Sequence, residues 1–407
     1  MGTTSRQRHA EPAPGEDERP APRRSRRRRV LIWTAAASAA VLAAGALAAG
    51  GFYWRLDHNI RHEDTDRLIG SGRPPKLNAA LNILLLGTDD RSGANAAYGP
   101  GMTKEPPRSD TMILLHLSPG GDRAIGASLP RDLMVPIPSC TRADGTRTGA
   151  VAAGMLNSSF TLGGASCTVK TVEGFAHVKI DHFMQVDFTS FKNVTTAVGG
   201  VEVCLPRAVD DRDSKLRLGK GRHVIEGETA LAYVRNRHGL GDGSDLQRIR
   251  RQQQFMASLA RKVLSAGTLT DPTRLLPLAE AGTKSLTTDD GLTVTGMVRI
   301  AQGMRDLTAG GLRFVTVPTG AYAPDHNRVA LSEPAAGRFF DAVRADRTLP
   351  GASASPSAGP PAGRRVQAKA GKAKAKTGVK TIPQQPDEVG AGDDACAPAG
   401  RKPDAHA

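Results

Sequence analysis

Residues Asn82–Asp90 read NILLLGTDD, and this stretch decides the fold that we expect for the chain. The apolar run Leu81–Leu86 is typical of a strand that is buried on both faces of a sheet. Similar apolar runs follow at Thr111–Leu117 and Ala124–Leu129. We therefore predict an α/β domain with these three strands in its central sheet.

Each of the three predicted strands has an acid and an arginine at one end. If neighbouring strands are antiparallel, the ends of the first and third strands lie beside the start of the second, and one sheet edge gathers these side chains. Strand ends often carry charges simply because they reach solvent, but three such ends in succession favour a site. The residues are Asp89, Asp90 and Arg91 after the first strand, Arg108 and Asp110 at the start of the second, and Arg131 after the third. Carboxylates beside arginines suit Mg²⁺ that is bound to phosphate oxygens.

A second candidate binding region, residues 233–254, reads YVRNRHGLGDGSDLQRIRRQQQ. Arg235 and Arg237 are two positions apart, so an extended backbone would point both guanidinium groups the same way. After a glycine-rich loop, Asp245 is placed to cap a new helix. These features predict a strand-like segment, a loop and a helix that together surround a binding cleft.

Arg248 and Gln252 share one face of the predicted helix with Asp245 and border an apolar stripe. Guanidinium groups that converge on one cleft imply a multiply charged anion such as a phosphate. The alternative is a basic helix whose charges are simply solvated. The stripe consists of Leu246, Ile249, Met256, Ala260 and Val263, whereas Arg250, Arg251 and Gln254 are expected to point elsewhere.

Residues 30–54 are uncharged and long enough to span a bilayer, which needs about 20 apolar residues. Trp33 lies near one end and Trp54 at the other, as interfacial aromatics do. The arginines before residue 30 keep the N-terminus in the cytoplasm by the positive-inside rule. A cleaved signal peptide is the competing interpretation, because Ala46–Ala48 offers small residues. The run exceeds the roughly 7–15 apolar residues usual in such peptides, so we favour an uncleaved, single-pass cell-membrane anchor.

Composition sets the remaining boundaries. We expect a disordered basic segment at 1–29, a transmembrane helix at 30–54, a polar stalk at 55–78, one extracytoplasmic α/β domain at 79–349 and a disordered Ala/Pro/Lys-rich tail at 350–407. Of the net charge of +15, residues 1–29 contribute +5 and residues 351–407 contribute +4. The domain therefore has only a modest basic surplus and few aromatic residues for stacking, so nucleic acid is not an expected partner.

Further elements are predicted from local patterns. The elements are a helix starting at Leu156–Phe160, helical sequence at Thr171–Phe175, a strand at Val178–Phe188, a short helix at Glu228–Tyr233, a strand at Leu312–Pro318 and a closing helix at Ser332–Val343.

The four cysteines are expected to lie in an oxidising compartment. Cys140 and Cys167 lie in loop-like sequence and form the disulfide that we predict. Cys204 is expected to be a buried free thiol, and Cys396 has no assignment. The sequence contains no GxSxG, SxxK or P-loop motif, so nothing indicates a protein nucleophile.

The chain resembles the LytR-CpsA-Psr family of Gram-positive envelope proteins, and its Ala- and Arg-rich composition looks actinobacterial. The matching stretches lie in family order over residues 81–255. They are NILLLGTDDRS, RSDTMILLHL, IGASLPRDL, TVEGF, IDHFMQVDFTSFKN, GGVEVCLP, GETALAYVRNRH and DLQRIRRQQQF. Where the family commonly has a lysine-led KLN or KIN segment, this chain reads MLN at Met155–Asn157.

The resemblance implies a three-layer α-β-α domain with a central mixed sheet. It also implies a transferase that moves a glycopolymer from a polyprenyl-pyrophosphate carrier onto the 6-hydroxyl of N-acetylmuramic acid in peptidoglycan. The resemblance further implies Mg²⁺, or Mn²⁺ in its place, on Asp89 and Asp110, with Asp90 as a substitute for Asp89. The implied catalytic residues are Asp89, Asp110, Arg131 and Arg235, and the implied substrate-binding residues are Arg91, Arg108, Arg131, Arg235, Arg237, Asp245, Arg248 and Gln252.

Three other functions stay open at this point. A pyrophosphatase that hydrolyses the same carrier would need the same anion clamp. A membrane-bound DNA-binding attenuator of transcription would need this domain inside the cell. A non-catalytic wall-tethering protein would not depend on Arg131 or Arg235.

Overall fold

The computed structural model describes residues 24–91, 93–98, 105–236, 240, 245–264, 271–284, 286–304, 307, 310–349, 388–390 and 396. The chain divides into two compact units, Met1–Trp54 and Arg55–Ala407. Helix α1 (Arg24–Asn59) makes up the described part of the first unit and continues into the second. Its residues Arg26–Asn59 are long and apolar enough to cross a membrane, as predicted for residues 30–54.

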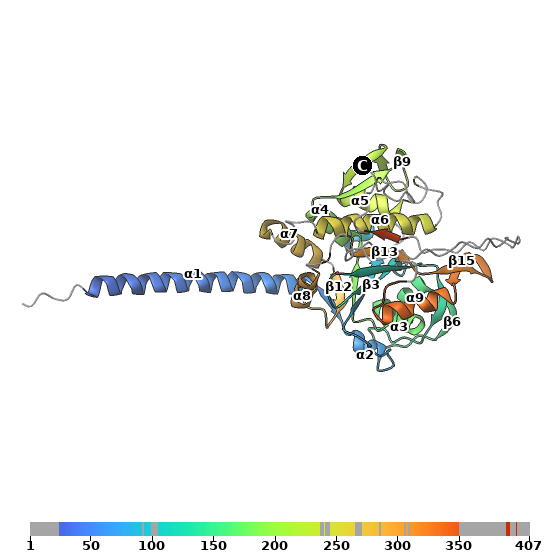
Figure 1. The fold of residues 1–407 in the computed structure, drawn as a ribbon, viewed down its shortest axis with the longest axis horizontal. Coiled ribbons are helices and arrows are strands. Elements are labelled where there is room, and N and C mark those ends of the chain that lie inside the picture. The colour runs from blue at the N-terminus through green and yellow to red at the C-terminus, as the bar shows by residue number, and fades with distance from the viewer. Residues whose placement is uncertain are drawn as a thin grey trace, which may run out of the picture. The chain divides into compact units, whose positions relative to one another are not determined.

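An eight-stranded mixed sheet forms the centre of the second unit (Figure 1). In spatial order its strands are β1 (Arg61–Glu63), β12 (Leu286–Asp289), β7 (His182–Val186), β2 (Leu81–Thr88), β3 (Ser109–Leu117), β4 (Ala124–Leu129), β13 (Leu312–Thr316) and β16 (Glu388–Gly390). β3 pairs antiparallel with both β2 and β4, which confirms the predicted arrangement of the first three strands. β2 pairs parallel with β7, and β4 pairs parallel with β13.

Helices cover both faces of this sheet, which confirms the expected three layers (Figure 1). Side chains alternate between the faces of a strand. Leu84 therefore packs with the side chains of α3 (Leu156–Ala176) and α9 (Ala335–Arg344), whereas Ile83 packs with those of α6 (Asp245–Leu264) and α8 (Val294–Gly303). The continuous apolar run of β2 is explained because both of its faces are buried.

A smaller core lies on the far side of α6 from the sheet. It contains side chains from α4 (Phe188–Ala197), α5 (Gly227–Arg235), α7 (Pro272–Thr283) and the ribbons β8–β11 (Val201–Leu205, Gly221–Ile225) and β9–β10 (Val209–Asp211, Leu216–Leu218). Phe255 of α6 points into this core and Ala257 into the core against the sheet, each with 1% of its surface exposed. The single apolar stripe predicted for α6 was therefore too narrow, because the helix is buried on two sides.

The predicted stalk at residues 55–78 is wrong, because this segment is part of the domain. β1 adds an edge strand to the main sheet beside β12, and α2 (Thr65–Ile69) follows it. Leu56, Ile60 and Leu68 are each less than 7% exposed. These scattered apolar residues are the signal that separates the segment from a solvated linker.

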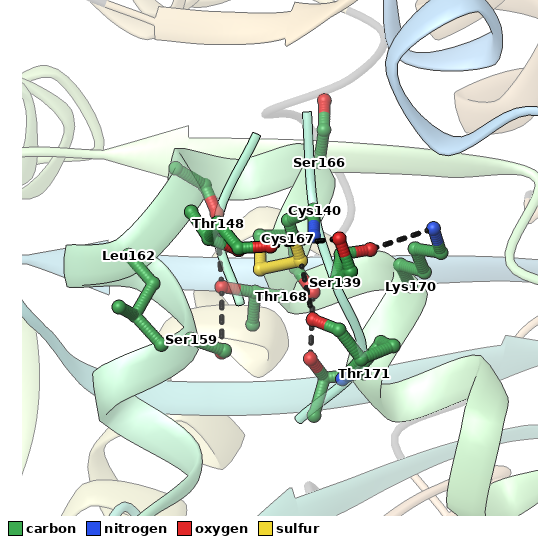
Figure 2. Close-up of a disulfide and its surroundings, with 12 residues drawn as sticks. Ser139, Cys140, Thr148, Ser159, Leu162, Ser166, Cys167, Thr168, Lys170 and Thr171 are labelled. Atoms are coloured by element: carbon green, nitrogen blue, oxygen red, sulfur yellow. Dashed lines mark hydrogen bonds between the residues drawn. A yellow bond between two sulfur atoms is a disulfide. The ribbon is translucent and has the colours of Figure 1, made fainter. Parts of the chain in front are cut away.

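The predicted Cys140–Cys167 disulfide is confirmed (Figure 2). Thr148 holds the Cys140 end, because its hydroxyl accepts a hydrogen bond of 3.0 Å from the Cys140 N–H. Gly163 interrupts α3 at this point, and a Cβ there would lie 2.8 Å from the Cβ of Cys167. The glycine therefore leaves the space that the bridge needs.

The prediction that Cys204 is a free thiol is wrong, because Cys204 on β8 forms a disulfide with Cys396. Part of the expected disordered tail also belongs to the fold. Strand β16 pairs with β13, Glu388 forms a 2.7 Å ion pair with Arg313, and Val389 packs into the core beneath α6. The C-terminal region is thus attached to the domain at two places, through residues 388–390 on β13 and through Cys396 on β8.

The remaining elements are short. They are the 3₁₀ helix η1 (Gly93–Tyr98), the ribbon β5–β6 (Met134–Ile137, Val151–Met155) and the ribbon β14–β15 (Thr319–Tyr322, Asp325–Leu331). The strand predicted at Val178–Phe188 is limited to β7. Asp187 ends it, because its carboxylate accepts a 2.8 Å hydrogen bond from the Ser190 N–H and caps α4.

A β-bulge interrupts the pairing of β2 and β3 beside the predicted site. Gly87 pairs with Thr111 and Thr88 pairs with Ser109, so Asp110 is an extra residue without an opposite partner in the ladder. A bulge redirects the side chain of the extra residue and bends the strand locally. Asp110 is therefore the residue of β3 that the bulge presents at the end of the sheet.

Candidate active site

A cavity of about 210 Å³ opens at the sheet edge where β2 and β4 end and β3 begins. Three acids and three arginines line it, which is the gathering of charges that the strand ends predicted. The lining residues are Asp89, Arg91, Glu105, Pro106, Arg108, Asp110, Arg131 and Asn157.

Arg131 and Asp110 form the central ion pair of the cavity. The Nη1 atom of Arg131 lies 2.8 Å from the Oδ1 atom of Asp110. The backbone of Arg131 is held by the first turn of α3, because its carbonyl accepts a 3.1 Å hydrogen bond from the Asn157 N–H. The side chain of Arg131 is only 20% exposed, so its guanidinium group has a restricted position facing the cavity.

Asp89 is fixed by reciprocal hydrogen bonds with the backbone of Arg108. The Asp89 N–H donates to the Arg108 carbonyl at 3.0 Å, and the Arg108 N–H donates to Asp89 Oδ1 at 2.6 Å. Arg91 Nη2 lies 3.5 Å from the other oxygen, Oδ2. Because an ionised carboxylate offers about four acceptor positions, Asp89 can still bind a further cationic group.

The acids of the cavity fit a Mg²⁺ ion that is shared with a phosphate. Asp89 and Asp110 line the cavity, whereas Asp90 does not. Within the described ranges, no group of three or more His, Cys, Asp or Glu side chains is arranged to hold a metal ion. Mg²⁺ commonly binds through one or two carboxylates, several waters and substrate phosphates, so two carboxylates are sufficient.

Three lining residues were missed by the sequence reasoning. Asn157 belongs to the MLN segment, and its place at the start of a predicted helix was the available signal. Glu105 and Pro106 lie in the connection between β2 and β3 and belong to no motif that we noted. These two residues line the cavity because the connection returns to the start of β3 at this point.

Arg235 does not line the cavity. It is the last residue of α5, so the extended backbone predicted for it is wrong. Its guanidinium carbon lies 4.5 Å from the centroid of the Phe188 ring and 5.7 Å from that of Tyr98, which is cation–π geometry. Arg237 and the side chain of Asp245 lie outside the described residues.

Helix α6 crosses the same sheet edge as the cavity. The side-chain amide of Gln253 donates hydrogen bonds to the hydroxyls of Ser128 on β4 (2.9 Å) and Thr316 on β13 (3.0 Å). Ser128 is three residues before Arg131, so their Cα atoms are at most about 11 Å apart. Arg248 precedes Gln253 by five residues, or roughly 7.5 Å along the helix axis. α6 is therefore anchored next to the strand end that carries Arg131.

The basic residues of α6 are not simply solvated. Arg248 and Arg251 are each 8% exposed, and Gln252 is half-buried. Burial lowers the pKa of Arg251 from its usual value, and the nearby Arg248 guanidinium lowers this pKa further. Two like charges thus lie close together in a poorly solvated place, which excludes the alternative of a solvated basic helix for this pair.

Arg251, which was expected to point elsewhere than the apolar stripe of α6, contacts the connection between α5 and α6. Arg251 Nη1 donates to the Leu240 carbonyl at 3.1 Å, and Nη2 donates to the Asn236 carbonyl. Arg251 therefore binds the connection between α5 and α6 at Asn236 and Leu240, on either side of residues 237–239. A spacing of three from Arg248 places it on a neighbouring helix face, and sequence alone did not indicate which loop it would meet.

Replacing Arg251 with methionine is expected to lower the free energy of unfolding by about 1–3 kcal/mol, because two buried carbonyls lose their donor. Urea denaturation of the purified protein measures this change. Arg217→Met is the matched control, since Arg217 is 85% exposed. Equal stabilities of the two variants would contradict the structural role of Arg251.

The sequence matches the LytR_cpsA_psr family model over residues 56–339. It is 33% identical over 264 residues to the cell wall biosynthesis protein LcpA of Corynebacterium glutamicum, covering 59% of this chain and 50% of that protein. It is 31% identical over 202 residues to the polyisoprenyl-teichoic acid–peptidoglycan teichoic acid transferase TagV of Bacillus subtilis, covering 48% and 46%. The chain thus spans about half the length of these curated relatives.

Solved structures share the fold at low sequence identity. A LytR-Csp2A-Psr enzyme from Actinomyces oris superposes with a TM-score of 0.52 at 22% identity, covering 70% of this chain and 96% of that one. B. subtilis TagV gives a TM-score of 0.52 at 24% identity, covering 66% and 98%. The similarity therefore extends over nearly the whole of both solved chains. The family match over most of this sequence shows that the chain belongs to the LytR-CpsA-Psr family.

Proposed function

We propose that this protein is a membrane-anchored phosphotransferase that moves a cell-wall glycopolymer from a polyprenyl-pyrophosphate carrier onto the 6-hydroxyl of N-acetylmuramic acid in peptidoglycan. The observation that carries this proposal is the cavity that combines Asp89 and Asp110 with Arg91, Arg108 and Arg131. The names of relatives such as TagV, a polyisoprenyl-teichoic acid–peptidoglycan teichoic acid transferase, support the choice of donor and acceptor.

In the proposed reaction the muramic acid hydroxyl attacks the phosphorus that carries the glycan. A new P–O bond forms to the acceptor, the bridging P–O bond breaks, and polyprenyl monophosphate leaves. Arg131 and its neighbours hold the phosphoryl oxygens and stabilise the negative charge that spreads over them. Either Asp89 or Asp110, which both line the cavity, accepts the proton of the hydroxyl. The residues thus act by positioning and by charge, without a covalent intermediate on the protein.

Asp89 and Asp110 would hold Mg²⁺ in this proposal. The bound ion would neutralise part of the charge of the diphosphate. Arg131, which already pairs with Asp110, would then contact the ligand from beside the metal site.

We also propose that α1 crosses the cell membrane with the N-terminus in the cytoplasm and the domain outside. The basic residues before residue 30 and the uncharged run that follows support this orientation. Protease added to intact cells should then cleave the domain. A protected domain would overturn this orientation and would favour an intracellular regulator.

The decisive test uses the full-length protein with a polyprenyl-pyrophosphate-linked glycan and peptidoglycan. Glycan coupled to peptidoglycan through a phosphodiester is the expected product. Release of phosphate products without coupling would identify a pyrophosphatase and overturn the proposal. Comparing the coupling of teichoic acid and arabinogalactan precursors in the same assay identifies which glycan the protein transfers.

Removing the metal is expected to abolish coupling, and Asp110→Asn is expected to raise the Mg²⁺ concentration that restores it. The reason is that this change removes one of two carboxylates for the ion. A Mg²⁺ titration after chelation measures the effect, with Asp122→Asn as the matched exposed control. An unchanged Mg²⁺ requirement in Asp110→Asn would contradict the assignment of this ligand.

A further inference from the structure

Helix α7 carries two exposed leucines that have no role in the described domain. Leu275 is 37% exposed and Leu276 is 47% exposed, whereas Leu278, two positions further along the helix, packs into the smaller core. Isolated apolar residues are common on protein surfaces and need no special cause. This pair differs from isolated surface residues because it lies close to the point where the chain enters the domain.

Two contacts align α7 with the end of α1. Arg55 Nη2 lies 2.6 Å from Glu280 Oε1, and the Asn59 side-chain amide donates to the Thr283 hydroxyl at 3.4 Å. Because Arg55 and Asn59 follow the same order as Glu280 and Thr283, the two helices run in the same direction here. Residues of α7 before Glu280 therefore lie on the side from which the chain enters the domain at Arg55.

The leucines lie on that side. Leu276 precedes Glu280 by four residues, which is about 6 Å of helix rise and nearly the same helix face. Leu275 is one residue further. Both side chains thus project beyond the Arg55–Glu280 ion pair, toward the entry point of the chain.

Arg55 directly follows Trp54, the last residue of the uncharged run. In a membrane-anchored chain, a change from an apolar run with a terminal tryptophan to an arginine marks the membrane–water interface. The Arg55–Glu280 pair then lies at the level of the headgroups. Apolar side chains beyond it meet the boundary between headgroups and acyl chains, into which an interfacial helix buries its apolar face by about 5–10 Å.

We infer that Leu275 and Leu276 insert into the outer leaflet of the bilayer and give the domain a second contact with the membrane beside its anchor. This inference rests on the proposed membrane anchoring and adds a defined docking surface to it. Two contacts restrict rotation of the domain about its anchor. The cavity would then be held at a fixed height and orientation above the lipid-borne donor.

Site-specific fluorescence in the full-length protein tests this contact. All four cysteines of the sequence are in disulfides, so an introduced cysteine supplies the single free thiol for an environment-sensitive dye. Leu276→Cys and Leu275→Cys are labelled separately in lipid nanodiscs. Val224→Cys is the matched control, because Val224 is a 67% exposed apolar residue on β11. Ser38→Cys, within the uncharged run, reports on the anchor itself.

Lipids brominated near the headgroup are expected to quench more than half of the fluorescence at Leu276→Cys and Leu275→Cys and to leave Val224→Cys unchanged. Deeply brominated lipids are expected to quench Ser38→Cys. If Ser38→Cys is quenched while both leucine positions behave like Val224→Cys, the docking surface is refuted and the anchor stands. If Ser38→Cys is not quenched, the anchor itself is refuted, and the docking inference is refuted with it.

Discussion

Replacing Arg131 with alanine is expected to lower the rate of glycopolymer transfer by roughly 10²–10³-fold, the usual effect of removing one preorganised donor to a developing oxyanion. Arg131 is 20% exposed and lies 2.8 Å from Asp110, so its guanidinium group is held in place beside the cavity before the substrate binds. The measurement is the initial rate of glycan coupling to peptidoglycan at saturating donor.

Two further variants separate charge from geometry. Arg131→Lys keeps the positive charge but loses the planar fork that binds phosphate through two parallel hydrogen bonds, so an intermediate loss is expected. Arg328→Ala is the control, because Arg328 pairs with the adjacent Asp132 at 3.2 Å and does not line the cavity. A wild-type rate in Arg131→Ala would refute the proposed phosphate contact and would favour a non-catalytic tethering protein.

The double variant Cys204→Ser/Cys396→Ser is expected to lose about 5 kcal/mol of unfolding free energy in the chain-entropy description of a cross-link. The two cysteines are 192 residues apart, so the bridge removes much conformational freedom from the unfolded chain. Detachment of β16 from β13 would add to this loss, because Val389 would leave the core. Urea unfolding without reductant measures the difference.

The other disulfide provides the matched comparison. Cys140 and Cys167 are separated by 27 residues, so Cys140→Ser/Cys167→Ser is expected to cost about 3–4 kcal/mol in the same description. The longer bridge should therefore have the larger effect by roughly 1–2 kcal/mol. The reverse order would show that local packing around each bridge outweighs loop length.

The central fold could be predicted because its signals are local and strong. The run Leu81–Leu86 is apolar at each position except Asn82, which indicates a strand buried on both faces, and the next two apolar runs along the chain form β3, which pairs with β2, and β4, which pairs with β3. The edge elements could not be predicted in this way. Strands β1 and β16 have three residues each, too few to show a periodicity. The partner of Cys204 lies 192 residues away, and no local pattern encodes that distance.

Prediction of the candidate site succeeded where residues follow strand ends and was less complete where they lie on helices. Asp89, Arg108, Asp110 and Arg131 meet because the ladder of an antiparallel sheet fixes which ends are adjacent. The partners of Arg251 could not be predicted, because a helix face shows only which residues share a direction. The loop that it meets depends on packing across α6, which buries both sides of that helix.

The bulge at Asp110 makes the proposed role of this residue separable from the pairing of the strands. Asp110 has no opposite partner on β2, and the pairs on either side of it, Gly87 with Thr111 and Thr88 with Ser109, do not require it. A chain from which residue 110 was deleted could align the same pairs in an unbroken ladder. Loss of this single codon could therefore remove one proposed metal ligand while the pairing of β2 and β3 is retained.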